Sequence, residues 1–277
     1  MNKKYLRLGC TETSLLFFYW YCNNIDTKNQ RINDGKYQLI KWLYTTSGYY
    51  DKKISSNYMD ATHKNVDPEI YIKYMEILMN FIKDADNFHF GVHYDTKTNE
   101  FNNFLKSLNI KNNVYMGTDF IFNLIKDQKV LFISPFANLF KKQIENGNVN
   151  KIYDKFTKPS VAFYYTNIYT FFNKGPHNDI LDTTNFLYED IINNVENNYD
   201  IVIISAGAYS NILAKKFYEN NKTVCTLGGD LQDMFGIMNN RNRKNNLQFD
   251  NAEYWITEIP DEYKPTDYKK IENGCYW

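Results

Sequence analysis

Short runs of consecutive apolar residues alternate along the chain with segments of helical period, and no other feature constrains the fold as strongly. Each run is too short for a helix, and several are apolar on successive residues, which is typical of strands buried on both faces. The runs lie at residues 5–8, 88–92, 130–134, 160–165, 201–205 and 223–227. Strands that alternate with helices predict an α/β fold with a largely parallel sheet.

Helical segments fill the intervals between these runs. Asp67 and Pro68 form a favourable start for a helix whose apolar residues fall on one stripe. A second helix is expected to open at Thr98. Three more are expected at residues 136–144, 183–195 and 208–219. These helices should pack on the faces of the predicted sheet.

The length of 277 residues suits a single α/β domain with insertions, and two tightly coupled halves are the alternative. We interpret residues 1–277 as one domain. Residues 23–66 are expected to form an irregular insertion around a helix at 37–44, and residues 238–277 a mostly extended tail.

Charge and apolar patterning restrict the classes of partner. Lys and Arg together number 32, as do Asp and Glu, so no bulk positive field favours nucleic acid. The apolar run at residues 15–22 is too short to cross a membrane and is wrongly flanked for a signal peptide. Four cysteines without CxxC spacing indicate a reducing compartment. We therefore expect a cytoplasmic protein without nucleic acid or membrane insertion.

Only four of the basic residues are arginines, namely Arg7, Arg31, Arg241 and Arg243. This skew toward lysine is typical of AT-rich genomes, of bacteria or of large viruses, and a viral protein would act in the host cytoplasm. Because lysine suffices for a simple positive charge, each remaining arginine is a candidate for a planar, two-pronged contact.

Ligands of open parallel sheets bind beyond the carboxyl ends of the strands, where loops lead into helix N-termini. The first such loop carries Arg7, Gly9 and Glu12. In the opening turn of a helix, Glu12 could ligate a divalent cation or a sugar hydroxyl, and Arg7 could orient it or bind a phosphate. The alternative is that Glu12 only favours the helix dipole or pairs with Arg7.

Two further loops follow buried strands and carry candidate substrate-binding residues. Ser134, ahead of Phe136, could offer its hydroxyl to a ligand or only cap the next helix. Gly207, Ala208 and Tyr209 follow the run at 201–205, where small residues let the backbone approach a phosphate or ribose closely. A tight turn from strand to helix accounts for the same residues without a ligand, and the GxGxxG pattern is absent.

Glycines and polar residues crowd the fourth loop, which contains Gly228, Gly229, Asp230 and Gln232. Asp230 and Gln232 could face a nucleotide or a sugar, and Phe235 could stack on a ring or pack in the core. Arg241 follows as the counter-charge for a diphosphate bound near this loop.

The histidines do not indicate a metal site. His63, His89, His93 and His177 lack the spacing of metal ligands, so we do not expect zinc. The sequence also contains no GxSxG elbow, P-loop or cysteine–histidine signature.

Several of these residues stand in motifs that resemble a known bacterial family. SAGAYSNILAK from Ser205 and LGGDLQDMFGI from Leu227, followed by Arg241, resemble its patterns GAYG-x-x-LA and LGG-x-x-Q-x-x-FGI-x-x-x-R. Three further segments resemble that family, namely R-x-G-x-x-E from Arg7, VLFISPF from Val130 and ENGCYW from Glu272. The matches run in the expected order over residues 7–277.

This family is similar to the GT-D type glycosyltransferases. The resemblance implies a Rossmann-like fold, a nucleotide-sugar donor and a divalent cation, Mn²⁺ or Mg²⁺. In GT-D enzymes an Asp-x-Glu motif engages the metal and the diphosphate. Here the aligned residues are Cys10, Thr11 and Glu12, so only the glutamate carries over as a metal ligand. A hard cation gains little from a cysteine, which leaves one carboxylate, phosphate oxygens and water to hold it.

The resemblance implies transfer of a sugar to a glycan or another hydroxyl acceptor. Arg241 and the helix N-termini after Gly9 and Gly207 would offset the charge of the departing diphosphate, and Asp230 or Glu12 would serve as the base. One alternative is a non-catalytic nucleotide- or sugar-binding module, in which the loss of the aspartate reflects lost chemistry. The other is a methyltransferase or oxidoreductase of Rossmann type that uses the turn at Gly207.

Overall fold

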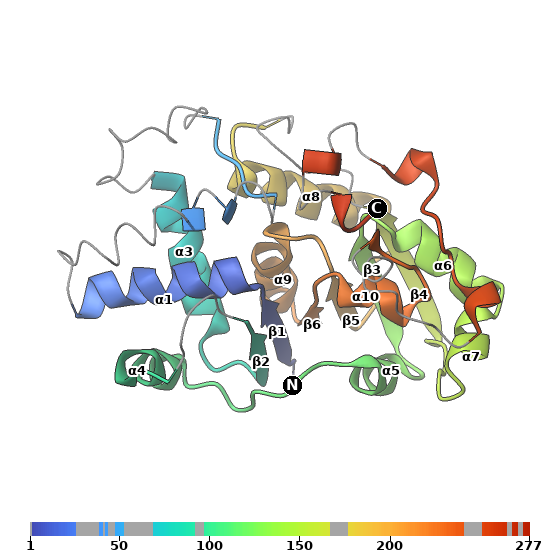
Figure 1. Cartoon of the computed structure of the whole chain (residues 1–277), viewed down its shortest axis with the longest axis horizontal. Helices are drawn as coiled ribbons and strands as arrows, with labels where there is room; N and C mark the ends of the chain where they lie inside the picture. The colour runs from blue at the N-terminus through green and yellow to red at the C-terminus, as the bar shows by residue number, and fades with distance from the viewer. Residues whose placement is uncertain are drawn as a thin grey trace.

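The sheet has six strands, all parallel, in the order β2-β1-β6-β5-β3-β4 (Figure 1). The computed structural model describes residues 2–25, 39–40, 42–43, 48–52, 69–91, 97–166, 177–240, 251–264, 268–270 and 274–277. The strands are β1 (Lys4–Leu8), β2 (Asn87–Phe90), β3 (Lys129–Ser134), β4 (Val161–Thr166), β5 (Ile201–Ile204) and β6 (Thr223–Thr226). Each apolar run of the sequence is one of these strands, which confirms the predicted Rossmann-like α/β fold.

Helices connect the strands. They are α1 (Cys10–Asn24), α3 (Glu69–Ile82), α4 (Asn99–Leu108), α5 (Thr118–Ile125), α6 (Ala137–Glu145), α7 (Asn148–Ile152), α8 (Ile180–Asn194), α9 (Tyr209–Glu219) and α10 (Asp230–Met234). The hydroxyl of Thr98 accepts a hydrogen bond from Phe101 N and caps α4, as the sequence predicted. Helix α8 begins a turn earlier than expected, because the carboxylate of Asp179 accepts from Leu181 N and Asp182 N.

The insertion and the tail are described in part. Residues 39–40 and 42–43 of the helix expected at 37–44 are helical, and its other residues lie outside the described ones. In the tail, short 3-10 helices occur at Ala252–Tyr254, Asp261–Tyr263 and Tyr268–Lys270.

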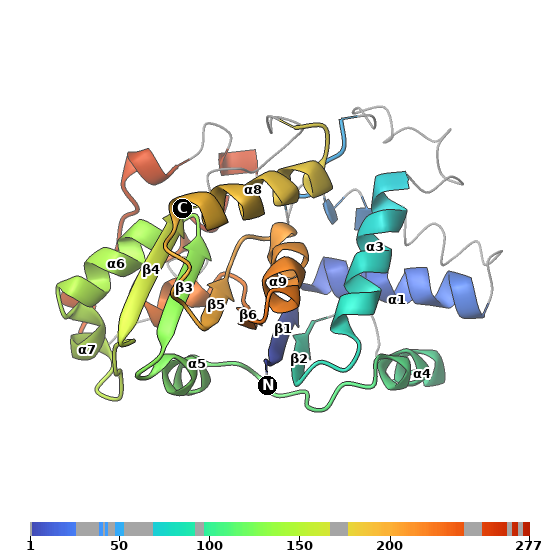
Figure 2. The same ribbon diagram turned by 180° about the vertical axis from the view of Figure 1, so that it is seen from behind.

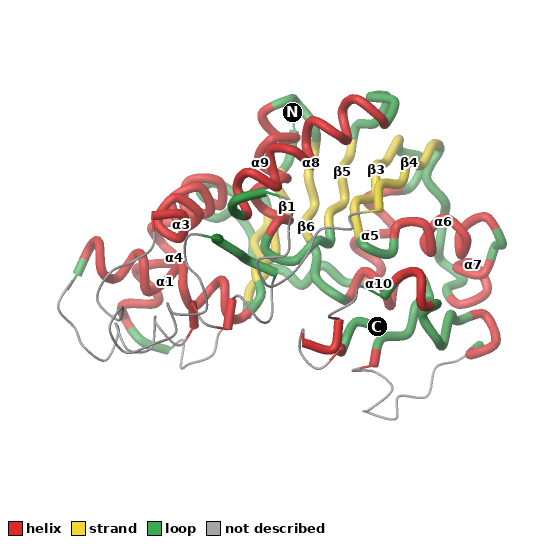
Figure 3. The backbone as a smooth tube through the Cα atoms, turned by 90° about the horizontal axis from the view of Figure 1, so that it is seen from above, coloured by secondary structure: helices red, strands yellow, loops and turns green. Residues whose placement is uncertain are grey.

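Two apolar layers cover the sheet. Leu131 and Ile133 of β3 face one layer with α3, α8 and α9, whereas Val130 and Phe132 face the other with α5, α6 and α10. Figure 2 shows α3, α8 and α9 in front of the sheet, and Figure 3 shows α8 and α9 on the side opposite α10. Because both faces are buried, the central strands carry apolar residues at successive positions.

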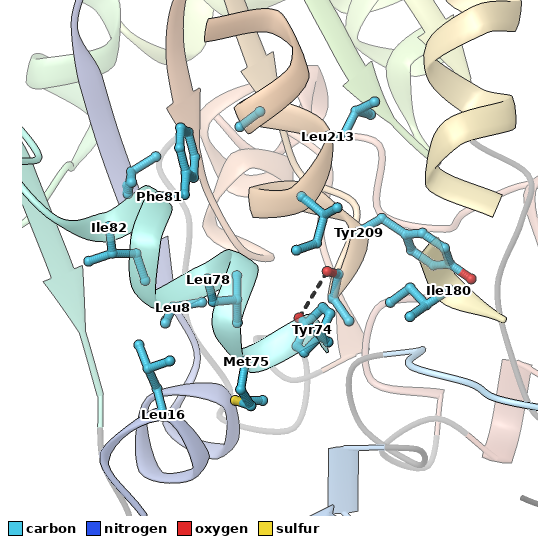
Figure 4. Close-up of a cluster of buried hydrophobic side chains, with 14 of the residues drawn as sticks. Leu8, Leu16, Tyr74, Met75, Leu78, Phe81, Ile82, Ile180, Tyr209 and Leu213 are labelled. Carbon is cyan, nitrogen blue, oxygen red and sulfur yellow. Dashed lines mark hydrogen bonds between the residues drawn. The ribbon is translucent and has the colours of Figure 1, made fainter. Parts of the chain in front are cut away.

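Helices α3 and α9 meet in the first of these layers (Figure 4). The hydroxyl of Tyr74 on α3 donates to the carbonyl of Ala208 at 3.0 Å, and both residues are buried. Leu78 of α3 and Leu213 of α9 pack in the same cluster. This contact fixes the loop that follows β5 against α3.

The chain leaves β1 and β6, which are neighbours, toward opposite faces of the sheet. After β1 it enters α1, whose Leu15 and Leu16 belong to the layer with α3 and α9. After β6 it enters α10, whose Leu231 and Met234 belong to the opposite layer. In open α/β sheets such a divergence produces a crevice at the carboxyl ends of the strands.

A buried polar network joins β1, β6 and α9 beside this divergence. Asn211 donates to the carbonyl of Arg7 at 3.0 Å and accepts from the Thr226 hydroxyl at 3.0 Å. The same hydroxyl accepts from Arg7 N at 2.9 Å. These hydrogen bonds hold the end of β1 next to the end of β6. Both Asn211 and Thr226 are buried, so water cannot replace their hydrogen-bond partners.

Replacing Asn211 by alanine should therefore lower the free energy of unfolding by about 1–3 kcal/mol, since a buried hydroxyl and a carbonyl lose their partner. Asn220→Ala is the matched control, because the Asn220 amide donates to Lys216 O on the exposed end of the same helix. Urea denaturation with an unchanged slope measures both changes. Equal losses in the two variants would show that the network does not stabilise the fold.

Candidate active site

Arg7 is the last residue but one of β1, beside the end of β6, at the edge of the sheet where the parallel strands end (the carboxyl edge). Its neighbours Leu6 and Leu8 face the layer with α3 and α9, so the Arg7 side chain points to the opposite face. Its Nη2 atom lies 3.8 Å from Oδ2 of Asp230. A Cβ atom on Gly228 would lie only 1.7 Å from Nη1, so the guanidinium rests directly on this glycine. Arg7 of β1 and the distant loop that carries Gly228 and Asp230, all predicted site residues, therefore meet.

Solvent reaches the pair of Arg7 and Asp230. Their side chains are 27% and 34% exposed, so the ion pair itself contributes little to stability. The guanidinium lies against Gly228 and remains partly exposed to solvent. An arginine in such a place can bind a phosphate with two parallel hydrogen bonds.

Two side chains that sequence reasoning did not select lie beside Arg7. In the parallel pairing of β1 with β2, Arg7 stands opposite His89, so both side chains point to the same face. The rings of His89 and Tyr115 lie 5.2 Å apart at 72°. Only the spacing of His89 to other histidines was considered in the sequence, and Tyr115 stands in a loop without a recognisable pattern. His89 and Tyr115 can be linked to Arg7 only through the register of β1 with β2, and this register cannot be read from the sequence.

Burial and the positive charge of Arg7 lower the pKa of His89 from its ordinary 6.5, and the negative charge of Asp230 opposes this shift. This shift favours the neutral form of the His89 imidazole.

We expect nuclear magnetic resonance titration to place the midpoint of His89 below 6.5. In Arg7→Met the midpoint should rise, because a cation that disfavours the imidazolium is removed. In Asp230→Asn it should fall, because an anion that favours the imidazolium is removed. The signal is assigned by its loss in His89→Gln. A His89 midpoint that stays unchanged in both variants would contradict the proximity of His89 to Arg7 and Asp230.

Glu12 stands in the first turn of α1 and is 8% exposed. Its carboxylate folds back over the N-cap, since a Cβ on Gly9 would lie 2.6 Å from Oε2. No hydrogen bond or ion pair reaches this carboxylate from the part of the chain that the structure describes. Burial raises the pKa of Tyr74 well above its ordinary value, and the charge of Glu12 raises it further. Glu12 thus lies near Tyr74, whose hydroxyl holds the loop after β5.

The loops after β5 and β6 are joined directly. The hydroxyl of Ser205 donates to the carbonyl of Gly228 at 2.9 Å. Gly207 has a φ of +55°, a backbone conformation that favours glycine, so the tight turn requires this residue. Ala208 and Tyr209 are buried, and the Tyr209 hydroxyl has no hydrogen-bond partner among the described residues.

The residues predicted after β3 take structural roles in the turn. The hydroxyl of Ser134 accepts from Phe136 N at 3.2 Å within the turn, and it does not cap α6, whose N-cap is Phe136. The Phe136 ring packs against Trp277 at 6.0 Å between ring centroids. Phe235 stacks on Phe140 at 4.8 Å and is fully buried, so it belongs to the core.

The end of the chain also covers part of the fourth loop. The Tyr276 ring lies against Gly229, where a Cβ would be 2.7 Å from it. Gln232 donates to the carbonyl of Tyr276 at 2.9 Å, and its own oxygen has no hydrogen-bond partner within the described ranges. Arg241 lies outside the described residues. The accessible part of the predicted site is therefore the part around Arg7, Gly228 and Asp230.

An open hollow of about 700 Å³ lies elsewhere, between the end of α6 and the start of β4. It is lined by residues such as Lys141, Lys158 and Tyr164 and by none of the predicted site residues. Its lining includes Lys158 and Ser160, which precede the first residue of β4.

Within the described ranges, no group of three His, Cys, Asp or Glu side chains could hold a metal ion. The Cys10 side chain, at the position of the expected aspartate, lies against Gly91, where a Cβ would be 2.5 Å from its Sγ. None of the helices described is both long enough and apolar enough to span a bilayer.

Comparison with known proteins adds no closer identification. No family model matches the chain, no curated protein is similar to it, and no solved structure matches it. The chain has a Rossmann-like parallel α/β fold that is compatible with nucleotide-binding transferases.

Proposed function

We propose that the protein is a glycosyltransferase that moves a sugar from a nucleotide-sugar donor to a hydroxyl acceptor. The position of Arg7 carries this proposal. Its guanidinium rests on Gly228 at the carboxyl edge, where β1 and β6 diverge, and it stays accessible to solvent. Such a place suits the diphosphate of a nucleotide. The motifs that resemble GT-D enzymes support the transfer of a sugar in particular.

In transfer, the bond between the anomeric carbon and the diphosphate oxygen breaks, and a bond to the acceptor oxygen forms. Negative charge grows on the departing diphosphate, and the Arg7 guanidinium stabilises it together with the free N–H groups at the start of α1. The acceptor hydroxyl loses its proton to a carboxylate. Asp230 suits this step, because it is partly exposed and lies 3.8 Å from Arg7.

Glu12 suits a divalent cation that binds together with the diphosphate. Its buried carboxylate is free of hydrogen bonds from the described residues, and Mg²⁺ or Mn²⁺ is often held by one carboxylate, phosphate oxygens and water. The cation would neutralise diphosphate charge when bound. A single carboxylate is too few protein ligands to hold such a cation firmly before the nucleotide arrives.

Mn²⁺ should therefore bind weakly alone and strengthen the binding of a nucleoside diphosphate, and Glu12→Gln should abolish this gain. Asp119→Asn is the matched control, because Asp119 is an exposed carboxylate in the first turn of α5. Calorimetric titration of the diphosphate with and without Mn²⁺ measures the effect. A gain that persists in Glu12→Gln would assign the cation to other residues.

The test of the function is a panel of nucleotide-sugars, titrated in a calorimeter and assayed for release of nucleoside diphosphate, with and without Mn²⁺. Transfer or hydrolysis of one donor is the expected result. Binding without turnover would instead support a non-catalytic module, which Cys10 at the position of the expected aspartate favours. Selective binding of S-adenosylmethionine or NAD would overturn the proposal in favour of a methyltransferase or oxidoreductase.

A further inference from the structure

We infer that Tyr115 and His89 bind the nucleobase of the nucleotide and so make the site prefer a nucleoside diphosphate over inorganic diphosphate. The inference rests on the proposed function, because it assumes that the phosphates bind at Arg7. It assigns a role to two residues that no motif of the sequence includes.

Among the described residues, the two sides of Arg7 along the sheet differ in what covers them. Toward β3, the ring of Tyr276 covers Gly229, and Trp277 packs on Phe136. Toward β2, the next side chain on the same face is His89, one strand spacing or about 5 Å away from Arg7 at the backbone. In the inferred binding mode, the nucleoside extends from Arg7 toward His89 on β2.

Tyr115 places an aromatic ring beside His89, from a loop that is attached to the amino-terminal end of β2. The residue is 57% exposed, although its ring contacts that of His89 at 5.2 Å between centroids. An exposed ring beside an accessible arginine suits a planar base, because bases stack on aromatic side chains.

The loop that carries Tyr115 is firmly held. The side chain of Asn87 donates to Val114 O at 2.8 Å and accepts from Val114 N at 2.8 Å. Phe88 N donates to Asn112 O at 2.9 Å, which attaches the same loop to β2. In Figure 1 the chain between α4 and α5 passes beneath β2 and β1, at the amino-terminal ends of these strands. Because the loop is fixed before a ligand arrives, little ordering is needed for Tyr115 to stack.

His89 adds polar recognition beside this ring. It is half-buried, and a neutral imidazole offers one hydrogen-bond donor and one acceptor to the edge of a base. Tyr115 would then supply most of the affinity for the base, and His89 part of the preference among bases.

The experiment compares two probes by calorimetry: inorganic pyrophosphate, and the tightest-binding of UDP, GDP, CDP and ADP. Tyr115→Ala should weaken the nucleoside diphosphate about tenfold and leave pyrophosphate unchanged. Tyr115→Phe keeps the ring and should bind within about twofold of the unmodified protein. Val114→Ala is the matched control, because Val114 is equally exposed on the same loop and should change neither affinity.

Unchanged binding of the nucleoside diphosphate in Tyr115→Ala, or an equal loss for pyrophosphate, would overturn this inference and leave the proposed function intact. A loss that appears only for the nucleotide-sugar, and not for the nucleoside diphosphate, would also overturn it and assign Tyr115 to the sugar. If the unmodified protein bound none of the four nucleotides, both the inference and the proposed function would fail. Loss of the His89 response to the nucleoside diphosphate in the Tyr115→Ala spectrum is the expected second readout.

Discussion

An Arg7→Met variant is expected to lose about 100-fold or more in kcat/KM for sugar transfer, which is the loss typical when one preorganised charge contact to a developing anion is removed. Methionine retains the apolar stem and removes the fork that the diphosphate would bind. The release of nucleoside diphosphate, followed at several donor concentrations, measures the loss. The contact between Arg7 and the diphosphate becomes stronger in the transition state. The substitution should therefore lower kcat as well as the affinity for the donor.

Two controls separate this effect from a general loss of charge or of folding. Lys73→Met removes a cation from an exposed ion pair with Glu69 and should leave activity unchanged. Arg7→Met itself should change the free energy of unfolding by less than about 1 kcal/mol, because its partner Asp230 is partly exposed. Arg7→Lys should recover only part of the activity, since an ammonium lacks the planar fork. Full activity in Arg7→Met would remove Arg7 from the mechanism.

The strands could be predicted from the sequence because a central parallel strand is buried on both faces. The run at residues 201–204 is apolar at every position for this reason, and the structure buries all four side chains. Helices α7 and α10 have five residues each, too few to show a helical period, and α5 has only eight; none of the three was predicted.

Candidate site residues could be selected from the sequence only where polar side chains stand at or just after the end of a strand. Arg7, Glu12 and Asp230 were selected as candidates in this way, because the carboxyl ends of parallel strands share one edge. The sequence does not display which ends are neighbours, since that depends on the strand order. His89 was therefore missed as a neighbour of Arg7, and the covering of Gly229 by Tyr276 is likewise a contact between distant segments.

Gly228→Ala is expected to lower kcat/KM about as much as Arg7→Met, although the substitution touches no charged group itself. The added methyl would lie 1.7 Å from Nη1 and 2.7 Å from Cζ of Arg7, so the guanidinium must move. That atom group is the flexible end of a long side chain, so the fold should accept the change with little loss of stability. Gly147→Ala is a control with the opposite expected result, a loss of stability without a loss of activity. No described atom lies within 4 Å of a Cβ added at Gly147, but its φ of +71° predicts a loss of about 1 kcal/mol in the free energy of unfolding.

The double variant tests whether Gly228 acts through Arg7. If the glycine only provides space for the guanidinium, then Gly228→Ala in the Arg7→Met background should lower kcat/KM by less than about threefold more, because the group that it displaces is already gone. Independent effects would instead multiply to about 10⁴-fold. Multiplication would mean that the Gly228 backbone contacts the nucleotide directly, and retention of activity in the single Gly228→Ala variant would mean that the position of Arg7 on this glycine has no part in catalysis.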